Sequence, residues 1–144
     1  MTMKPRKILL PVDGSDNSNR AVELVVAYAA SGLVGEVHLL NVQRPVSGDV
    51  SAFVGKRVLQ GFHHDEGMKV LRPAESRVAQ AGLKTALHIG VGEPADIIVE
   101  FCDDLGCDDI VMGTHGLGGA VGLLLGSVTT DVLAKSKVPV TLVK

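Results

Sequence analysis

Residues 113–131 read GTHGLGGAVGLLLGSVTTD and follow the strand-like segment DDIVM. Five glycines and a Gly-Ser pair surround a short apolar run in this stretch. Glycines allow bare backbone amides to face an anion, and a helix N-terminus adds unpaired N–H groups and a favourable dipole. Because Gly126 and Ser127 are expected to begin a helix, the stretch is either a phosphate-binding loop or an ordinary strand-to-helix turn.

Two other phosphate-binding patterns do not match the sequence. No Gly-Lys-Ser or Gly-Lys-Thr follows a glycine at the spacing of a Walker A loop. The nearest match to a dinucleotide fingerprint is GVGEPA at residues 90–95. No acidic residue ends the strand after it to hold a ribose, so a tight strand-to-helix turn is the simpler interpretation.

Short β-branched runs alternate with helical patterns along the chain. Strands are predicted at residues 8–12, 37–42, 85–89, 110–112 and 138–143. A first helix is predicted from the spacing of Ala21, Leu24, Val25 and Tyr28 and ends near Gly32, and further helices cover about 62–81, 94–105 and 126–135. Residues 43–60 contain one proline and two glycines and are predicted to be a long, mobile connection.

These elements predict one α/β domain over residues 1–144. Strands that are apolar on both faces, separated by helical crossovers, are typical of a parallel sheet with helices on both sides. Ligands in such sheets bind beyond the carboxyl ends of the strands, where the strand order reverses. Asp13, Val42 and the stretch 113–131 all lie at such ends, which favours a ligand site there.

Composition excludes several classes of function. The formal net charge of −2 provides neither the basic surface that nucleic acids require nor a polybasic membrane signal. Aromatic residues, which stack on single-stranded bases, are scarce. No apolar segment has the length of a membrane span. Cys102 and Cys107 have no disulfide framework around them, so they are expected to be reduced thiols in a cytoplasmic protein.

The spacing Gly113-x-x-Gly116, nine residues, then Gly126-Ser127 resembles the nucleotide-binding signature of the universal stress protein family. Three further segments are similar to the family: KILLPVDGSDNSNRAVELVVAYA, GEPADIIVEFCDDLGCDDIVMGTHG and SKVPVTLVK. The similarity covers almost the whole chain and is weakest between residues 43 and 80. It implies a five-stranded parallel sheet of order 3-2-1-4-5 with an adenine-nucleotide alpha hydrolase-like, Rossmann-like fold.

The resemblance also implies ATP as the ligand, with Mg²⁺ or Mn²⁺ at its phosphates. Asp13 would lie near the ribose, Pro11 and Val12 would line the base, and the backbone of Val42 would contact adenine. The ribose and phosphates would be enclosed by Gly113, Thr114, His115, Gly116, Leu117, Gly118 and Gly119, and the β- and γ-phosphates would meet Gly126, Ser127, Val128 and Thr129.

One feature departs from the family. Many members have basic residues between the two glycine clusters, where this chain reads GAVG at residues 119–122. Neutralisation of the phosphate charge is therefore expected from backbone amides and a divalent metal. The departure also favours an alternative, a nucleotide-free dimeric interaction module of the same fold.

Other candidate residues are assigned simpler roles. The run at residues 63–66, HHDE, has metal-ligand residue types, but consecutive helical residues point apart, so a solvated face is expected. His38 and His88 lie inside predicted strands and are expected to be partnered core or sheet-face histidines. A receiver domain would need an acidic pair after the first strand and an aspartate after the third, where only Asp13 and His88 stand.

The function expected from the resemblance is regulatory. Bound ATP would set a conformation that an unknown downstream partner recognises in a stress response. No nucleophile, base and orienting residue form a set, so efficient catalysis is not expected. Slow ATP hydrolysis, or autophosphorylation at Ser127 or Thr129, is compatible with hydroxyls near the γ-phosphate.

The C-terminal strand predicts a homodimer. Residues 138–143, VPVTLV, would form the last strand of the sheet and lie at its edge, where unpaired backbone groups invite another strand. Pro139 is tolerated near the start of a strand or on an edge. A twofold axis would pair this strand antiparallel with its own copy and close the assembly at two subunits, as family members commonly do.

Overall fold

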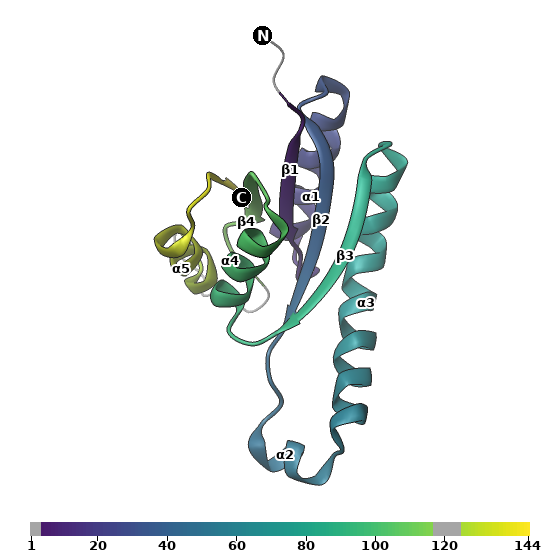
Figure 1. Ribbon diagram of the computed structural model, residues 1–144, viewed down its shortest axis with the longest axis vertical. Helices are drawn as coiled ribbons and strands as arrows, with labels where there is room; N and C mark the ends of the chain where they lie inside the picture. Colours follow the sequence, from purple (N-terminus) through teal and green to yellow (C-terminus); the bar gives the residue numbers. More distant parts are fainter. Residues whose placement is uncertain (1–3, 117–124) are drawn as a thin grey trace.

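A computed structural model of the chain describes residues 4–116 and 125–144. Its five strands are β1 (Arg6–Pro11), β2 (Val34–Gln43), β3 (Lys84–Val91), β4 (Asp109–Gly113) and β5 (Val140–Val143). They form one parallel sheet in the order β3-β2-β1-β4-β5 (Figure 1). The predicted fold class and strand order are therefore confirmed. The final strand begins two residues later than predicted.

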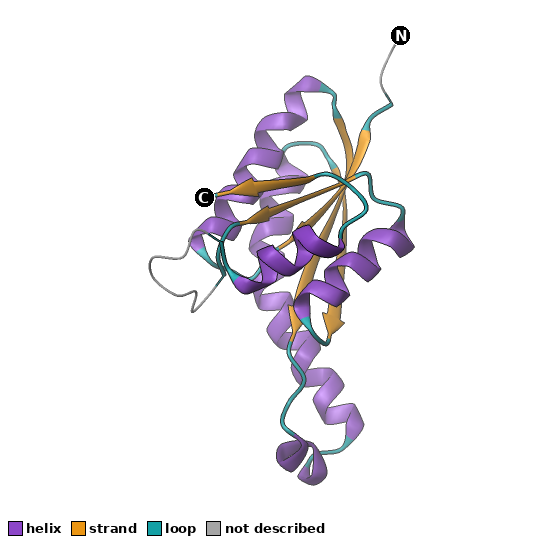
Figure 2. Ribbon diagram, turned by 90° about the vertical axis from the view of Figure 1, so that its left-hand side faces the viewer, coloured by secondary structure: helices purple, strands orange, loops and turns teal. Residues whose placement is uncertain are grey.

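Helices cover both faces of the sheet, as Figure 2 shows. On one face, α1 (Asp16–Tyr28), followed by a 3-10 turn over Ala29–Ser31, packs beside the long helix α3 (Lys56–Gln80). On the other face, α4 (Pro94–Leu105) packs beside α5 (Ser127–Lys135). This arrangement agrees with the sequence-based expectation of two helical layers.

The central strand β1 shows why the strands are apolar on both faces. Ile8 and Leu10 point into the core beneath α1 and α3, whereas Leu9 points into the core beneath α4 and α5. Leu9 and Leu10 are completely buried. Alternation between two buried faces removes the apolar–polar alternation of a one-sided sheet and leaves a continuous apolar run.

Residues 43–60, predicted to be a long connection, include regular secondary structure. They contain the end of β2, the helix α2 (Gly48–Phe53) and the first turn of α3. The Ser47 hydroxyl caps α2 by accepting a hydrogen bond from the Val50 N–H at 3.4 Å. In Figure 1, α2 and the adjoining end of α3 extend beyond the sheet, and Phe53 is 92% exposed there.

The histidines of residues 63–66 are not uniformly solvated. His64 is exposed, but His63 is buried on the face of α3 that packs against the sheet. Gly67, one turn later on the same face, lies against Ile89 of β3, where a Cβ atom would approach the Ile89 side chain within 2.7 Å. The expectation of a wholly solvated face was therefore wrong for His63, because the run crosses from the outer to the inner side of the helix.

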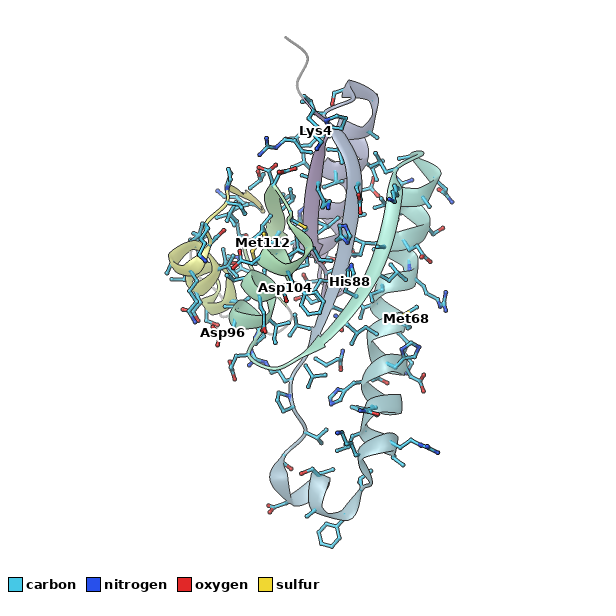
Figure 3. The ribbon with its side chains drawn as sticks, viewed as in Figure 1. Lys4, Met68, His88, Asp96, Asp104 and Met112 are labelled. Carbon is cyan, nitrogen blue, oxygen red and sulfur yellow. The ribbon has the colours of Figure 1, made fainter. Side chains whose placement is uncertain are left out.

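His38 and His88 are partnered, as predicted. The His38 Nδ1 and His88 Nε2 atoms lie 2.7 Å apart, and the His38 Nε2 atom lies 2.7 Å from the Glu36 carboxylate. Since the carboxylate accepts from the His38 Nε2–H, the unprotonated Nδ1 accepts from the His88 Nε2–H. The His88 ring also packs against Phe101 of α4, and Figure 3 shows its position on β3.

This arrangement predicts a pH dependence of stability. Burial, and secondly the neighbouring His38, lower the pKa of His88 below its ordinary value. The unfolded chain therefore binds a proton more readily than the folded chain, and stability falls as pH drops through about 6.5. Denaturant unfolding between pH 7.5 and 5.5 should show that the free energy of unfolding falls less steeply in His88→Gln than in the wild type. The glutamine keeps a donor toward His38. His64→Gln, at an exposed position, should retain the wild-type slope, and an unchanged slope in His88→Gln would contradict the assignment.

Both cysteines are buried free thiols. Burial raises the pKa of Cys107 to about 12, and the Cys102 thiol has its pKa raised by the same cause. The thiolate form needed for reactivity or metal binding is therefore disfavoured at both positions. Within residues 4–116 and 125–144, no helix combines the length and apolar character of a membrane-spanning helix.

Candidate functional site

Among the described residues, a cavity that we name the main cavity opens between β1 and β4, where the strand order reverses. These strands pair through Ile8 with Asp109 and Leu9 with Ile110. Beyond those pairs, Pro11 and Val12 lie on one side and Met112 and Gly113 on the other side of a cavity of about 210 Å³. Ligands of doubly wound sheets bind at this crevice.

An adjoining cavity of about 160 Å³ lies between the first turns of α4 and α5. The two cavities share Arg44, Pro94 and Val128 in their linings. Together they have a volume of a few hundred Å³, in the range of small-molecule sites. The position of Asp96 in the lining of the second cavity can be followed in Figure 3.

The end of β2 places a backbone edge in the main cavity. The last β1–β2 pair joins Pro11 with Leu40, and the Val12 N–H donates to the Leu40 carbonyl at 2.8 Å. Alternate residues of a strand direct their backbone groups toward the same neighbour. The N–H and C=O of Val42 are therefore directed toward the β1 side, one step beyond that last pair. Such an edge matches the N6 donor and N1 acceptor of adenine.

Asp13 is positioned by the turn between β1 and α1. Its carboxylate accepts a hydrogen bond from the Ser15 N–H at 2.9 Å, and its own N–H donates to the Ser18 hydroxyl at 3.1 Å. Gly14 has a φ of 84°, in the left-handed region that favours glycine. The Ser15 hydroxyl caps α1 by accepting from the Ser18 N–H at 3.2 Å. The turn thus fixes an acceptor at the cavity wall.

Gly116 lies directly beside this carboxylate. A Cβ atom at position 116 would stand 2.5 Å from the Asp13 Oδ2 atom, so a side chain there would push the carboxylate aside. Gly113 is constrained differently, because its Cβ would approach Asn17 of α1 within 2.8 Å. Gly116 therefore leaves room for a carboxylate at the cavity wall, whereas Gly113, which also lines the cavity, leaves room for the packing of α1.

The N-terminus of α5 faces the second cavity. Gly126 occupies its cap position without a side-chain hydrogen bond, so the N–H groups of the first turn are available to an anion. Ser127 is exposed and lines this cavity. Thr129, in contrast, is 2% exposed, and its hydroxyl donates to the Gly113 and Thr114 carbonyls at 3.1 and 3.2 Å. Thr129 thereby attaches α5 to the segment after β4.

Most of the predicted site residues come together. Those lining the main cavity are Pro11, Val12, Asp13, Val42, Gly113, His115, Gly116, Val128 and Thr129. Thr114 is buried beside them, with its hydroxyl accepting from the Asn17 amide at 3.3 Å. Leu117, Gly118 and Gly119 lie outside the described residues.

Six residues of the main cavity were not predicted from sequence: Ser18, Leu40, Arg44, Pro94, Ile98 and Met112. Leu40 and Met112 are recognisable from sequence only as strand residues near carboxyl ends. Arg44 follows β2 directly and is the one arginine or lysine among the described residues of this lining. Its position two residues after Val42 is the signal that would have identified it.

Comparison with known proteins assigns the chain to a family. The model of the universal stress protein family matches residues 4–144. The chain belongs to the universal stress protein family. Universal stress protein MJ0531 of Methanocaldococcus jannaschii is 34% identical over 96% of this chain and 82% of that relative.

Two solved structures show the likeness in three dimensions. The structure of MJ0577, from the same archaeon, aligns with a TM-score of 0.84 and 34% identity over 96% of this chain and 95% of that one. A universal stress protein in complex with cAMP aligns with a TM-score of 0.67 and 29% identity over 98% of each chain. The solved relatives thus share the fold of this universal stress protein over nearly its whole length.

Proposed function

We propose that this universal stress protein binds ATP in the cavity between β1 and β4 and acts as a nucleotide-dependent regulator in the cytoplasm. One observation carries the proposal: a single cavity at the strand-order reversal joins the Val42 backbone edge, the Asp13 carboxylate and the bare backbone of Gly116. These groups suit a base, a ribose and a phosphate chain respectively. The solved complex of a relative with cAMP supports an adenine nucleotide as the ligand.

The hydrogen-bonding groups of the two cavities fit a nucleotide with a phosphate tail. Asp13 offers a ribose acceptor, and the first turn of α5 offers N–H groups to phosphates. Mg²⁺ or Mn²⁺ bound with ATP would supply further neutralisation of the phosphate charge. A partner protein that recognises the nucleotide-bound conformation would convert binding into regulation.

The Ser127 and Thr129 hydroxyls at the start of α5 differ in how accessible they are to a phosphoryl group. The Thr129 hydroxyl is buried and engaged with two carbonyls, so we assign it a structural role. Ser127 is exposed at the second cavity and is the better candidate for autophosphorylation. We propose binding, with at most slow turnover, as the main activity.

Calorimetry with ATP, AMP and GTP in the presence of Mg²⁺ tests the proposed ligand. The purine edge of guanine reverses the donor and acceptor of adenine at the atoms that face Val42, so ATP should bind at least about tenfold more tightly than GTP. Equal affinities for ATP and GTP would contradict recognition by this edge. If none of the three nucleotides binds, the result would favour the nucleotide-free dimeric interaction module.

We further propose that the protein is a homodimer formed through β5. This strand lies at the edge of the sheet, with β4 on one side. The Ile110 N–H donates to the Pro139 carbonyl and the Thr114 N–H donates to the Val143 carbonyl. By alternation, the backbone groups of Thr141 also face β4, whereas those of Val140 and Leu142 face outward. The outward groups are suited to pairing with a second copy.

A further inference from the structure

Arg44 lies where the two cavities meet. It follows directly after β2 and contributes to both linings, together with Pro94 and Val128. The main cavity is lined by Asp13 and Gly116, and the second cavity is lined by residues of the first turn of α5. A nucleotide whose ribose lies at Asp13 and whose phosphates reach α5 must pass this shared boundary.

The second cavity is otherwise acidic. Glu93, Asp96 and Asp131 line it, and Lys135 is the other cation in its described lining. Lys135 is already paired with Asp96, with the Nζ and Oδ1 atoms 2.5 Å apart. A phosphate tail with several negative charges would meet carboxylates here unless a cation separates the two. Arg44 is the cation placed to do so.

The present partner of Arg44 is weakly held. Its Nη1 atom lies 3.6 Å from the Glu93 Oε2 atom, and the two side chains are 62% and 76% exposed. Exposed ion pairs of this kind contribute little and exchange readily. A guanidinium can instead donate two parallel hydrogen bonds to phosphate oxygens, which are stronger, charge-assisted bonds.

We propose that Arg44 binds the terminal phosphates of the nucleotide and that Glu93 competes with those phosphates for its guanidinium. The inference rests on the proposed nucleotide site and extends it. It also supplies, from the end of β2, the positive charge that the sequence does not place between the two glycine clusters. The proposal adds this cation to the backbone amides and divalent metal that the sequence led us to expect at the phosphates.

Binding of ATP and of adenosine by matched variants tests this role. Arg44→Gln should weaken ATP binding by about tenfold or more and leave adenosine binding unchanged, since only the phosphates lose a partner. Glu93→Gln should tighten ATP binding, and this gain should be smaller in the double variant with Arg44→Gln. Arg72→Gln, an equal change of charge at an exposed position on α3, should leave both affinities at wild-type values. Thermal melts establish that each variant is folded.

The outcomes separate this inference from the proposed function. Wild-type protein that binds neither ATP nor adenosine would overturn the proposed function, and this inference with it. Wild-type protein that binds both, together with an Arg44→Gln variant no weaker for ATP than Arg72→Gln, would overturn only the role of Arg44. An equal loss of ATP and adenosine binding in Arg44→Gln would also overturn it, because the side chain would then serve the shape of the cavity.

Discussion

Replacement of Gly116 by valine is expected to abolish ATP binding while the protein stays folded. The Cβ atom would stand 2.5 Å from the Asp13 Oδ2 atom, so the carboxylate proposed to hold the ribose would have to move. Because Gly116 lines the cavity, the added side chain would also reduce the space for a ligand there. Several ligand contacts would be lost together, so affinity should fall by about a hundredfold or more. The increase in melting temperature that ATP produces in the wild type should be absent from the variant.

Gly61→Val is the matched control for this substitution. Position 61 lies in α3, and a Cβ atom there meets nothing within 4 Å. This variant should keep both the fold and the wild-type affinity for ATP, since valine is no worse than glycine inside a helix. Retained ATP affinity in Gly116→Val would show that this glycine serves only the chain turn.

Replacement of Leu142 by proline is expected to convert the proposed dimer into a monomer. The Leu142 N–H faces outward from the edge strand, so proline removes a donor to the second copy without breaking the β4–β5 ladder. The dimer dissociation constant should rise by about tenfold or more. Light scattering at micromolar concentration distinguishes the two states.

Two further variants separate backbone pairing from other effects. Leu142→Ala removes the side chain but keeps the N–H, so it should remain dimeric. Thr141→Pro removes a donor that faces β4 and should mainly lower the melting temperature. Wild-type protein that is monomeric at micromolar concentration would contradict the proposed β5 interface directly.

The parts of the fold that sequence predicted well share a local cause. Two-sided burial produces continuous apolar runs such as residues 8–10, and these mark the strands without any knowledge of the sheet. Helix α4 was equally clear, because Pro94 occupies its first turn and Gly106 ends it with a φ of 65°. In both cases, neighbouring residues alone determine the element.

The parts that sequence missed depend on tertiary placement. Residues 48–53 contain a glycine and few buried groups, so their helix gives no amphipathic signal toward the sheet. Burial of His63 depends on which face of α3 packs against β3. A short run such as HHDE does not reveal which of its residues lie on that face. Only the β4–β5 pairing shows that the backbone groups of Thr141 face β4 while those of Leu142 face outward, so sequence alone does not identify which position to replace in the edge strand.

In the candidate site, too, sequence predicted the locally determined features and missed those set by tertiary placement. The glycine spacing predicted which segment would approach a ligand, and Gly116 does lie at the cavity wall. It could not distinguish the role of Gly116 from that of Gly113, whose absent Cβ makes room for Asn17. The position of Arg44 at the carboxyl end of β2 was readable from sequence, but its place beside α5 in the second cavity depends on elements that are distant in sequence.

Titration of ¹⁵N-labelled protein with Mg²⁺ and ATP, followed by backbone amide resonances, tests the central claim most directly. The proposed site predicts saturable shifts for the amides of Val42, Gly113, Gly116 and Val128, which come from β2, β4, the segment after β4 and α5 and meet in the lining of the cavity. Amides of α2, far from the cavity at the projecting end of the molecule, should stay unchanged. Saturable shifts at those four positions are the expected result; no saturable shifts, or shifts confined to another surface, would contradict an adenine nucleotide site between β1 and β4.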